Sequence, residues 1–501
     1  MANNRKHTNT RKKFTKGHNS PNYSQLVEEN RRLKSLIVNE RYESAQSYLA
    51  NATHWMKADR LSPDAASSPS VRATLRSRSR FECIENNPFL KGTIATVCND
   101  FSGNGVRVNV LDDSFSEEEK LVIERRWDEW CLAIKMRDIL WRGCMGKIVD
   151  GECFAMETFD KNLNHPVQMK IQLFEPECVV SPIDLAQDDK IYDGIRFDSN
   201  NNPTAYFILY EHPGGGLFNV AKPGEGRWVD AERIRHWFRR DRGWHRAIPE
   251  MASSLPLCAV LRRYTMAELK KQEVNASYTV FFESQMPSFA PQGQTKPPTF
   301  DQIPITPGTG VALPYGMSAK EFGRTVSGQE YDSFVGSILR EIIRPLEVPF
   351  NIAIGTSKDS NMASAVVDAH LYKSSQETRR QSCEEDFLYP TFYDWFKMGC
   401  LTRGYFSSRG RFASDNWLEN PPLVRFYWKK VGLDHTDPYK VAQAKVLLRD
   451  AGILLDEDIQ QEDYDRDLKV WQDKVKKEAQ FRRENLTIEE AEPSSNDNEQ
   501  D

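Results

Sequence analysis

Apolar residues recur at two different spacings along the chain, and this predicts both helices and strands. Residues 80–101 show helical spacing, which breaks at Asn86–Asn87–Pro88. A Gly-containing turn then leads to Val106, Val108 and Val110, which alternate with polar residues as in a half-buried strand. We therefore expect a folded block that starts near Arg80 with helices and continues with strands.

A helix with a core-facing stripe follows the first strand. Ser116 and Glu119 form a capping-box pattern, S-x-x-E, which marks a helix start. Behind it, four large apolar residues repeat at helical spacing, and we expect them in the core: Ile123, Trp127, Trp130 and Ile134. Further strands are predicted at 153–159, 169–175, 194–198 and 205–211, with Gly turns at 212–216 and 223–226. The mixture predicts an α+β fold class.

The second half of the chain is mainly helical in pattern. One helical stretch runs to about Glu283, and a second covers 327–347. Between them, 286–326 is rich in Pro and Gly with short strand-like pieces, as in a small insertion. After the polar loop 355–361, a helix is predicted over 362–399 with a kink at Pro390. Residues 400–432 look short and extended, and 438–484 look helical and charged.

The two ends of the chain carry opposite charge. The first 20 residues have no acid and hold Arg5, Lys6, Arg11, Lys12, Lys13 and Lys16. An amphipathic helix with Leu26, Leu33 and Ile37 on one face is predicted next, and the Ser/Pro/Arg-rich segment 59–79 has the composition of a linker. The last 13 residues have no base and hold Glu489, Glu490, Glu492, Asp497, Glu499 and Asp501.

Composition excludes several classes of protein. The net charge of the 501 residues is −5, which argues against a tight nonspecific DNA binder, because such proteins gather Lys and Arg to neutralise phosphates. No apolar run approaches the roughly 20 residues of a membrane span, so no membrane partner is expected. The N-terminus lacks an apolar signal core. Nine cysteines without a CxxC pair are typical of reduced thiols in a cytosol.

Catalytic and cofactor motifs are missing from the sequence. The stretch GCMGKIV (143–149) is the nearest approach to a phosphate-binding loop, but it lacks the spacing and the hydroxyl that would hold Mg²⁺. G-x-S-x-G and H-E-x-x-H do not occur. Asp150 and Glu152 form a carboxylate pair that could bind a metal, although a turn entering a strand is the favoured interpretation. We expect no catalytic residue, no metal and no cofactor.

Basic residues concentrate in two places. One is the stretch FRRDRGWHR, with Arg239, Arg240, Arg242 and Arg246, flanked by His236 and His245 without a metal-ligand spacing. The other is the following helix, with Arg262, Arg263, Lys270 and Lys271. These side chains suit contacts with phosphate or salt bridges between subunits, and the sequence leaves both roles open.

Five stretches, taken in order, give the chain a resemblance to a known family. They are SRSRFECIENNPFLKGTIATVCNDFSGNGVRV (77–108), the strand pair within 171–214, RGWHRAIPEMASSLPLCAVLRRYTMAELKKQEVNASYTVFF (242–282), ILREIIRPLEVPFNIAIGTSKDSNMASAVVDAHLY (338–372) and DPYKVAQAKVLLRDAGILLDEDI (437–459). Over about 75–480 this order resembles phage portal proteins of the lambda type. One departure concerns the loop, where the family commonly has Asn-Tyr-Ser-Ser-Ala-Arg and this chain has Asn361-Met362-Ala363-Ser364-Ala365-Val366.

The resemblance implies an α+β portal fold with a fixed order of parts. A basic arm, amphipathic helix and linker (1–74) would precede the first part of a wing (75–249). A stem helix (250–285), a clip (286–326), a second stem helix (327–347) and a channel loop (348–362) would follow. The chain would end in a long helix with the second part of the wing (363–432), a helical crown (433–484) and an acidic tail (485–501).

The same resemblance implies a structural role in a virus particle. Such a protein, assembled in the host cytoplasm, forms a homo-dodecameric ring at one capsid vertex of the virion. Its partners are the terminase large subunit, the major capsid and scaffold proteins, head-completion or adaptor proteins, and the double-stranded DNA in the channel. The DNA-facing loop would comprise Ser357, Lys358, Asp359, Ser360 and Asn361. The alternatives are an Mg-dependent nucleic-acid enzyme and a virion head protein of another type.

Overall fold

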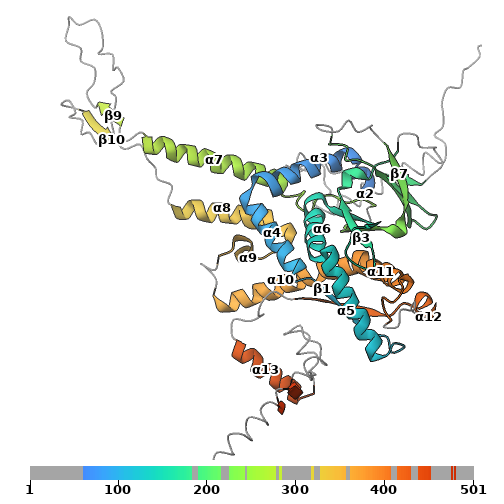
Figure 1. Cartoon of the computed structure of the whole chain (residues 1–501). Coiled ribbons are helices and arrows are strands. Elements are labelled where there is room, and N and C mark those ends of the chain that lie inside the picture. The colour runs from blue at the N-terminus through green and yellow to red at the C-terminus, as the bar shows by residue number, and fades with distance from the viewer. Residues whose placement is uncertain are drawn as a thin grey trace, which may run out of the picture. The chain divides into compact units, whose positions relative to one another are not determined.

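Helices and antiparallel strands alternate along the chain in its computed structural model (Figure 1). The structure describes residues 60–182, 190–215, 225–242, 245–277, 281–284, 317–320, 328–356, 361–407, 415–429, 438–452, 475–477 and 479–480. This mixture agrees with the predicted α+β class. The predicted N-terminal arm and amphipathic helix, and the acidic tail, lie outside the described residues.

Helices begin earlier than the sequence pattern suggested. Helix α2 spans Pro63–Ala66 and α3 spans Pro69–Arg80, within the segment predicted as a linker. The linker prediction was wrong because Arg72 and Arg76, which read as solvent-facing, are buried against carboxylates of the fold. A π-helical turn (Phe81–Asn86) then separates α3 from α4 (Pro88–Ser102). This is the break that the sequence placed at Asn86–Asn87–Pro88.

The first strand and the helix behind it form as predicted. Strand β1 (Val106–Val110) buries its three valines, and α5 (Glu117–Ile134) begins with the Ser116–Glu119 capping box. Helix α6 (Met136–Asp150) follows directly. Strand β1 pairs antiparallel with β11 (Val424–Trp428), so two segments that are far apart in the sequence form one small sheet.

Two further antiparallel sheets contain the other predicted strands. The three-stranded sheet has the order β3-β2-β8, from Met169–Phe174, Glu152–Phe159 and Ile234–Phe238. The four-stranded sheet has the order β4-β5-β6-β7, from Ile191–Tyr192, Ile195–Phe197, Pro203–Leu209 and Gly226–Asp230. Short 3-10 turns occupy Pro176–Cys178 and Ala231–Arg233.

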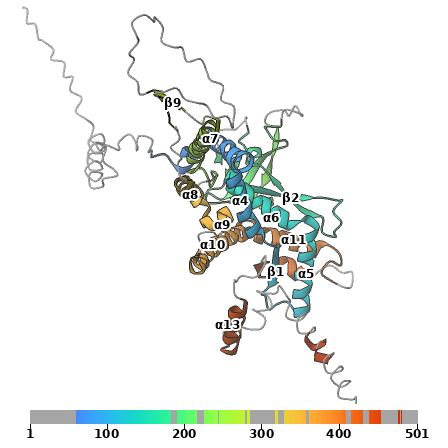
Figure 2. The ribbon, with the colours of Figure 1, turned by 90° about the vertical axis from the view of Figure 1, so that its left-hand side faces the viewer.

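Two long helices, α7 (Leu255–Ser277) and α8 (Gly328–Ile343), lie side by side (Figures 1 and 2). The helix predicted to reach Glu283 is shorter, because Phe281–Ser284 forms strand β9, paired with β10 (Met317–Lys320). Most of the predicted Pro/Gly-rich insertion lies outside the described residues. A 3-10 turn (Arg344–Leu346) and the short helix α9 (Phe350–Ile354) follow α8.

The last helices depart from the single predicted helix over 362–399. Helix α10 (Met362–Cys383) passes through a π-helical turn (Glu384–Leu388) into α11 (Tyr389–Leu401). Pro390 stands at the start of α11, where its missing N–H is tolerated, so the predicted disturbance at this proline takes the form of a π turn. Helices α12 (Asp415–Glu419) and α13 (Pro438–Asp450) follow, and residues 475–477 and 479–480 are also helical. None of the described helices has the length and apolarity to cross a bilayer.

A cluster of aromatic side chains forms the centre of the core. The predicted stripe of α5 is buried, and Trp127 and Trp130 are fully enclosed. The ring of Trp127 lies 5.2 Å from that of Trp395 on α11 and 5.4 Å from that of Phe392, in edge-to-face contacts. The indole of Trp130 donates to the carbonyl of Met169 at 3.0 Å. These contacts fix α5, α11 and the three-stranded sheet to one another.

Candidate functional site

Both ends of the predicted channel loop are capped. Helix α9 ends at Gly355, whose left-handed backbone (φ +68°) lets its N–H bond back to the preceding turn. The N–H of Thr356 donates to the carbonyl of Asn351 at 3.2 Å. On the far side, the side chain of Asn361 accepts the N–H of Ser364 at 2.8 Å and caps α10. Helix α9 therefore ends at Gly355, and α10 begins after Asn361.

A hydrogen bond joins the two helices that flank the loop. The side-chain amide of Asn351 on α9 donates to the carboxylate of Asp368 on α10 at 3.3 Å. Helix α9 lies between α8 and α10 in both views (Figures 1 and 2). The base of the loop is thus closed by side chains from both of its sides.

The loop base is also attached to the core. The hydroxyl of Thr93 on α4 donates to the carbonyl of Ala353 at 3.2 Å, and Arg340 of α8 stacks over the ring of Phe350 at 4.4 Å. On the other side, the hydroxyl of Tyr372 of α10 donates to the carboxylate of Asp100 of α4 at 2.8 Å. Helix α4 therefore holds both flanks of the loop.

Of the predicted loop residues, only Asn361 is placed by the structure, as the cap of α10. Ser357, Lys358, Asp359 and Ser360 lie outside the described residues. Residues 364–367, directly after the cap, are exposed, including Val366 and Val367.

The four arginines of the basic stretch have different surroundings. Arg246 is completely buried and donates to both oxygens of Glu152 at 2.7–3.1 Å, and to the carbonyls of Val179 and Asp193. Its N–H groups donate to groups within this chain, so we assign Arg246 a structural role and no contact with phosphate or a neighbouring subunit. Arg239 and Arg240 are exposed.

Two exposed arginines of this stretch, Arg239 and Arg240, form ion pairs within the chain. Arg239 pairs with Asp241 at 2.7 Å and with Glu347 at 3.4 Å. Arg240 pairs with Asp386 at 3.3 Å and stacks over Phe238. Arg242 is also exposed. The nearby His245 pairs with Asp64 at 2.7 Å.

The basic residues of α7 are all exposed, and they differ in their partners. Arg262 stacks over the ring of Phe81 at 5.8 Å, and Lys271 pairs with Glu268 at 3.5 Å. Arg263 and Lys270 make no ion pair with any part of the chain that the structure describes. These two remain available to a partner.

Asp150 and Glu152, the carboxylates weighed as metal ligands, are bound by arginines instead. Burial alone would raise the pKa of Glu152, but the charges of Arg246 and Arg76 hold it well below its usual value. Burial raises the pKa of Asp150 to about 6, against the opposing hydrogen bond from Arg80. Gly151 between them has a left-handed backbone (φ +90°). The favoured interpretation, a turn entering a strand, is confirmed.

One other group of ligating side chains occurs within the described ranges. Atoms of Glu175, Glu177 and His212 lie within 4.8 Å of one another. Arg80 already pairs with Glu177 at 2.8 Å and with Glu175 at 3.3 Å. Its guanidinium supplies the positive charge that these carboxylates require.

Sequence reasoning missed Glu250, which lies just before α7. Its buried carboxylate pairs with Lys147 of α6 at 2.8 Å and with Arg379 of α10 at 3.4 Å. Burial opposes ionisation, yet the charges of Lys147 and Arg379 lower the pKa of Glu250 to about 2. The neighbouring Pro249 and Met251 gave no sign of burial, so this glutamate looked like an ordinary surface charge.

A family model settles the relationship to known proteins. The model described as phage portal protein, lambda family, matches residues 50–370, which is more than half of the chain. The chain belongs to the lambda family of phage portal proteins. This family consists of structural proteins.

Solved structures give weaker matches. A chain in the virion of a native gene transfer agent particle has 12% identity and a TM-score of 0.41, covering 77% of this chain and 92% of its own. A chain in the neck of an empty particle, computed with C6 symmetry, has 12% identity and a TM-score of 0.42, covering 82% and 97%. A chain in the neck of a native particle, computed with C12 symmetry, has 12% identity and a TM-score of 0.39, covering 78% and 93%. Comparison with curated protein sequences gives no match.

Proposed function

We propose that copies of this portal-family chain form a dodecameric ring at one vertex of a capsid. The ring is the channel through which a terminase packages double-stranded DNA and through which the DNA is later ejected. Membership of the portal family supports this role. The order of described elements agrees with it, since a pair of long helices is followed by a capped loop and another long helix.

Under this proposal, each segment takes a place in the ring. Residues 75–249 are the first part of the wing, and α7 and α8 are the two stem helices around a clip at 286–326. Helix α10 carries the chain back into the wing after the channel loop at 348–362. Residues 433–484 form the crown. The clip docks the terminase and later the head-completion or tail proteins, and the capsid and scaffold proteins surround the wing.

The closed base of the loop is the observation that carries the assignment of the channel loop. Asn351 and Asp368 join the two flanking helices, and α4 anchors both, so the helices on either side of residues 357–360 are held together. A loop of small polar groups on such a support can face DNA without catalysis. A ring of about twelve copies at −5 each carries roughly −60, so the salt-dependent attraction to phosphate is small and DNA slides.

The loop assignment is tested with Lys358→Ala and Ser360→Ala in particles assembled with their capsid proteins. We expect rings of normal size in negative-stain images, together with a loss of packaged or retained DNA per particle. Lys161→Ala is the matched control, because Lys161 lies exposed in the turn between β2 and β3. Loss of rings would show that the loop is structural. Normal DNA content in both loop variants would contradict the assignment.

A further inference from the structure

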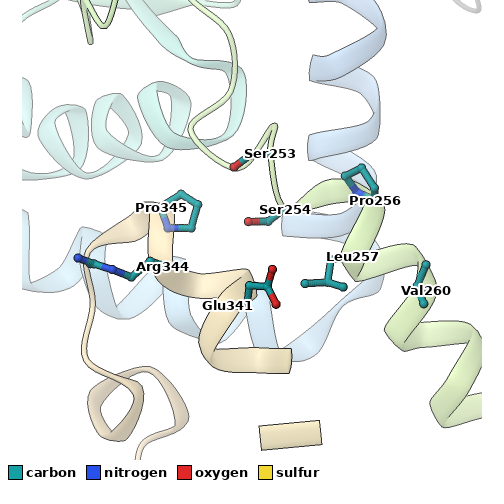
Figure 3. A pocket seen from close by; sticks show the side chains of 8 residues that line it. All are labelled: Ser253, Ser254, Pro256, Leu257, Val260, Glu341, Arg344 and Pro345. Atoms are coloured by element: carbon teal, nitrogen blue, oxygen red, sulfur yellow. The ribbon is translucent and has the colours of Figure 1, made fainter. Parts of the chain in front are cut away.

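An open groove lies where α7 and α8 meet the rest of the fold (Figure 3). It has a volume of about 580 Å³, and its lining is mostly apolar with two charged side chains: Ser253, Ser254, Pro256, Leu257, Val260, Glu341, Arg344 and Pro345. Glu341 is exposed beside Leu257, and no described residue gives it a hydrogen bond or ion pair. The groove therefore presents the carboxylate of Glu341 next to an apolar surface, without an ion pair among the described residues, and Arg344 is the cation in the same lining.

Helix α7 has two faces with different surroundings. Leu257, Leu261 and Tyr264 lie on the face toward α8, where the ring of Tyr264 lies 6.2 Å from Tyr331 and 5.0 Å from Phe334. On the opposite side, a set of exposed residues at helical spacing forms what we call the outer stripe: Ala259, Arg263, Met266, Ala267 and Lys270.

The outer stripe is apolar and basic, and nothing described in this chain covers it. The side chain of Met266 is 62% exposed. Arg263 and Lys270 are exposed without an ion pair among the described residues. The stripe thus offers apolar area together with cations that can pair with Glu341, which is the complementarity expected of two surfaces that bind each other.

We propose that the outer stripe of one copy docks into the groove of the next copy, with Arg263 paired to Glu341 of the neighbour. This inference rests on the proposed ring. Different patches meet in such a head-to-tail contact, and repetition around an axis closes it into a ring. Rotation about the ring axis does not change the position of a residue along that axis, so surfaces in contact must lie at similar heights. Val260 lines the groove and Arg263 follows it by one helical turn, so groove and stripe lie at neighbouring levels of the stem.

Exchange of the two charges tests the contact. We prepare the full chain with Arg263→Glu, with Glu341→Arg, and with both substitutions. Native mass spectrometry and negative-stain images give the ratio of rings to monomers, and circular dichroism reports folding. Each single variant should lower that ratio by roughly tenfold or more, as for other close charge pairs. The double variant should recover most of it, because it restores an opposite-charge pair. Arg78→Glu, an exposed arginine on α3, is the control and should assemble as wild type.

The outcomes separate this contact from the ring itself. If wild type and all variants form rings equally, the Arg263–Glu341 contact is wrong while the proposed function stands. If the single variants lose rings and the double variant does not regain them, the pairing is also wrong. If wild type forms only monomers, alone and in assembled particles, the ring and this contact fail together. Glu341→Gln replaces Glu341→Arg should the latter not fold, and it should weaken rings in the same direction.

Discussion

Asn351 and Asp368 meet across the base of the proposed channel loop, where the amide nitrogen of one lies 3.3 Å from a carboxylate oxygen of the other. The two residues belong to different helices, α9 and α10, with the loop 357–360 between them. Fixing the ends of a loop reduces the space that its residues explore. The pair therefore holds the two ends of the loop together.

We predict that Asn351→Ala loosens the loop while the chain still folds. Loss of one partly exposed hydrogen bond should lower the free energy of unfolding by only about 0.5–1.5 kcal/mol. The effect on DNA should be larger, because every copy in a ring would lose the same restraint. The measurement pairs urea unfolding with the DNA content of assembled particles.

A double-mutant cycle with Asp368→Ala separates this bond from other effects. If the two residues act through their contact, the double variant should resemble either single variant in DNA content. Additive losses would show that Asn351 and Asp368 act independently, and the role given to the loop base would then be incorrect.

Glu250 should be a major determinant of stability. It is buried between Lys147 and Arg379, so Glu250→Gln leaves two buried cations without their counter-charge. Breaking a buried ion pair in this way costs about 3–5 kcal/mol. Urea unfolding at pH 7 measures the change, and Glu118→Gln on the exposed start of α5 is the control. A change of under about 1 kcal/mol, as for a surface pair, would contradict the assignment.

The same carboxylate predicts an effect of acid. The pKa of Glu250 is about 2 in the folded chain and 4.5 in its ordinary state, so its ionised form stabilises the fold. This contribution is fully present above pH 4.5 and is lost as the pH falls toward 2. Wild type should therefore lose stability over this range more steeply than Glu250→Gln, as measured by unfolding at fixed urea between pH 5 and pH 2.5.

Local patterns predicted local structure well. The spacing of Ile123, Trp127, Trp130 and Ile134 gave a buried helix face, and the alternation of Val106, Val108 and Val110 gave a strand. These signals work because both periods come from backbone geometry alone. The pairing of β1 with β11 could not be predicted from the sequence, since more than 300 residues separate the two strands and no turn connects them.

Charged residues were the main source of error, because their burial depends on partners far along the chain. Arg72 and Arg76 looked like part of a linker, and Arg246 looked like a ligand for phosphate or for a neighbouring subunit. All three are buried and form ion pairs with carboxylates distant in sequence. The Asn351–Asp368 contact had no sequence signal either, since it depends on how α9 and α10 pack. The assignment of 357–361 as a DNA-facing loop came from the resemblance and stays a prediction.

Gly151 cannot be replaced without moving the backbone around it. Its φ is +90°, and an added Cβ would lie 2.2 Å from the carbonyl carbon and oxygen of Ile248. Gly151→Ala should therefore cost more than about 3 kcal/mol, from strain and overlap together. Gly105→Ala is a matched control, since Gly105 also has a positive φ of +100° but has open space around its Cβ position. Equal losses of unfolding free energy would show that strain alone matters at Gly151.

Glu157 should make the fold less stable in alkaline solution. The guanidinium of Arg235 bridges the carboxylates of Glu157 on β2 and Asp394 on α11. Burial, and then a shared proton with Asp394, raise the pKa of Glu157 to about 8 from an ordinary 4.5. The protonated form is thus favoured in the folded chain. Its stabilising effect is fully present below pH 4.5 and is lost as the pH rises through 8.

Glu157→Gln isolates this effect, because its neutral amide can donate to Asp394 at any pH as the protonated carboxyl does. Free energies of unfolding should be measured from pH 5 to pH 9. Wild type should lose stability more steeply than Glu157→Gln from pH 5 up to about pH 8, and the two curves should run parallel above that. From pH 5 to pH 6 both proteins should also lose stability through Asp150, whose pKa is raised to about 6, so the steeper loss in wild type is the part due to Glu157. Parallel curves up to pH 9 would mean that Glu157 is ionised throughout, with Arg235 holding both carboxylates as anions.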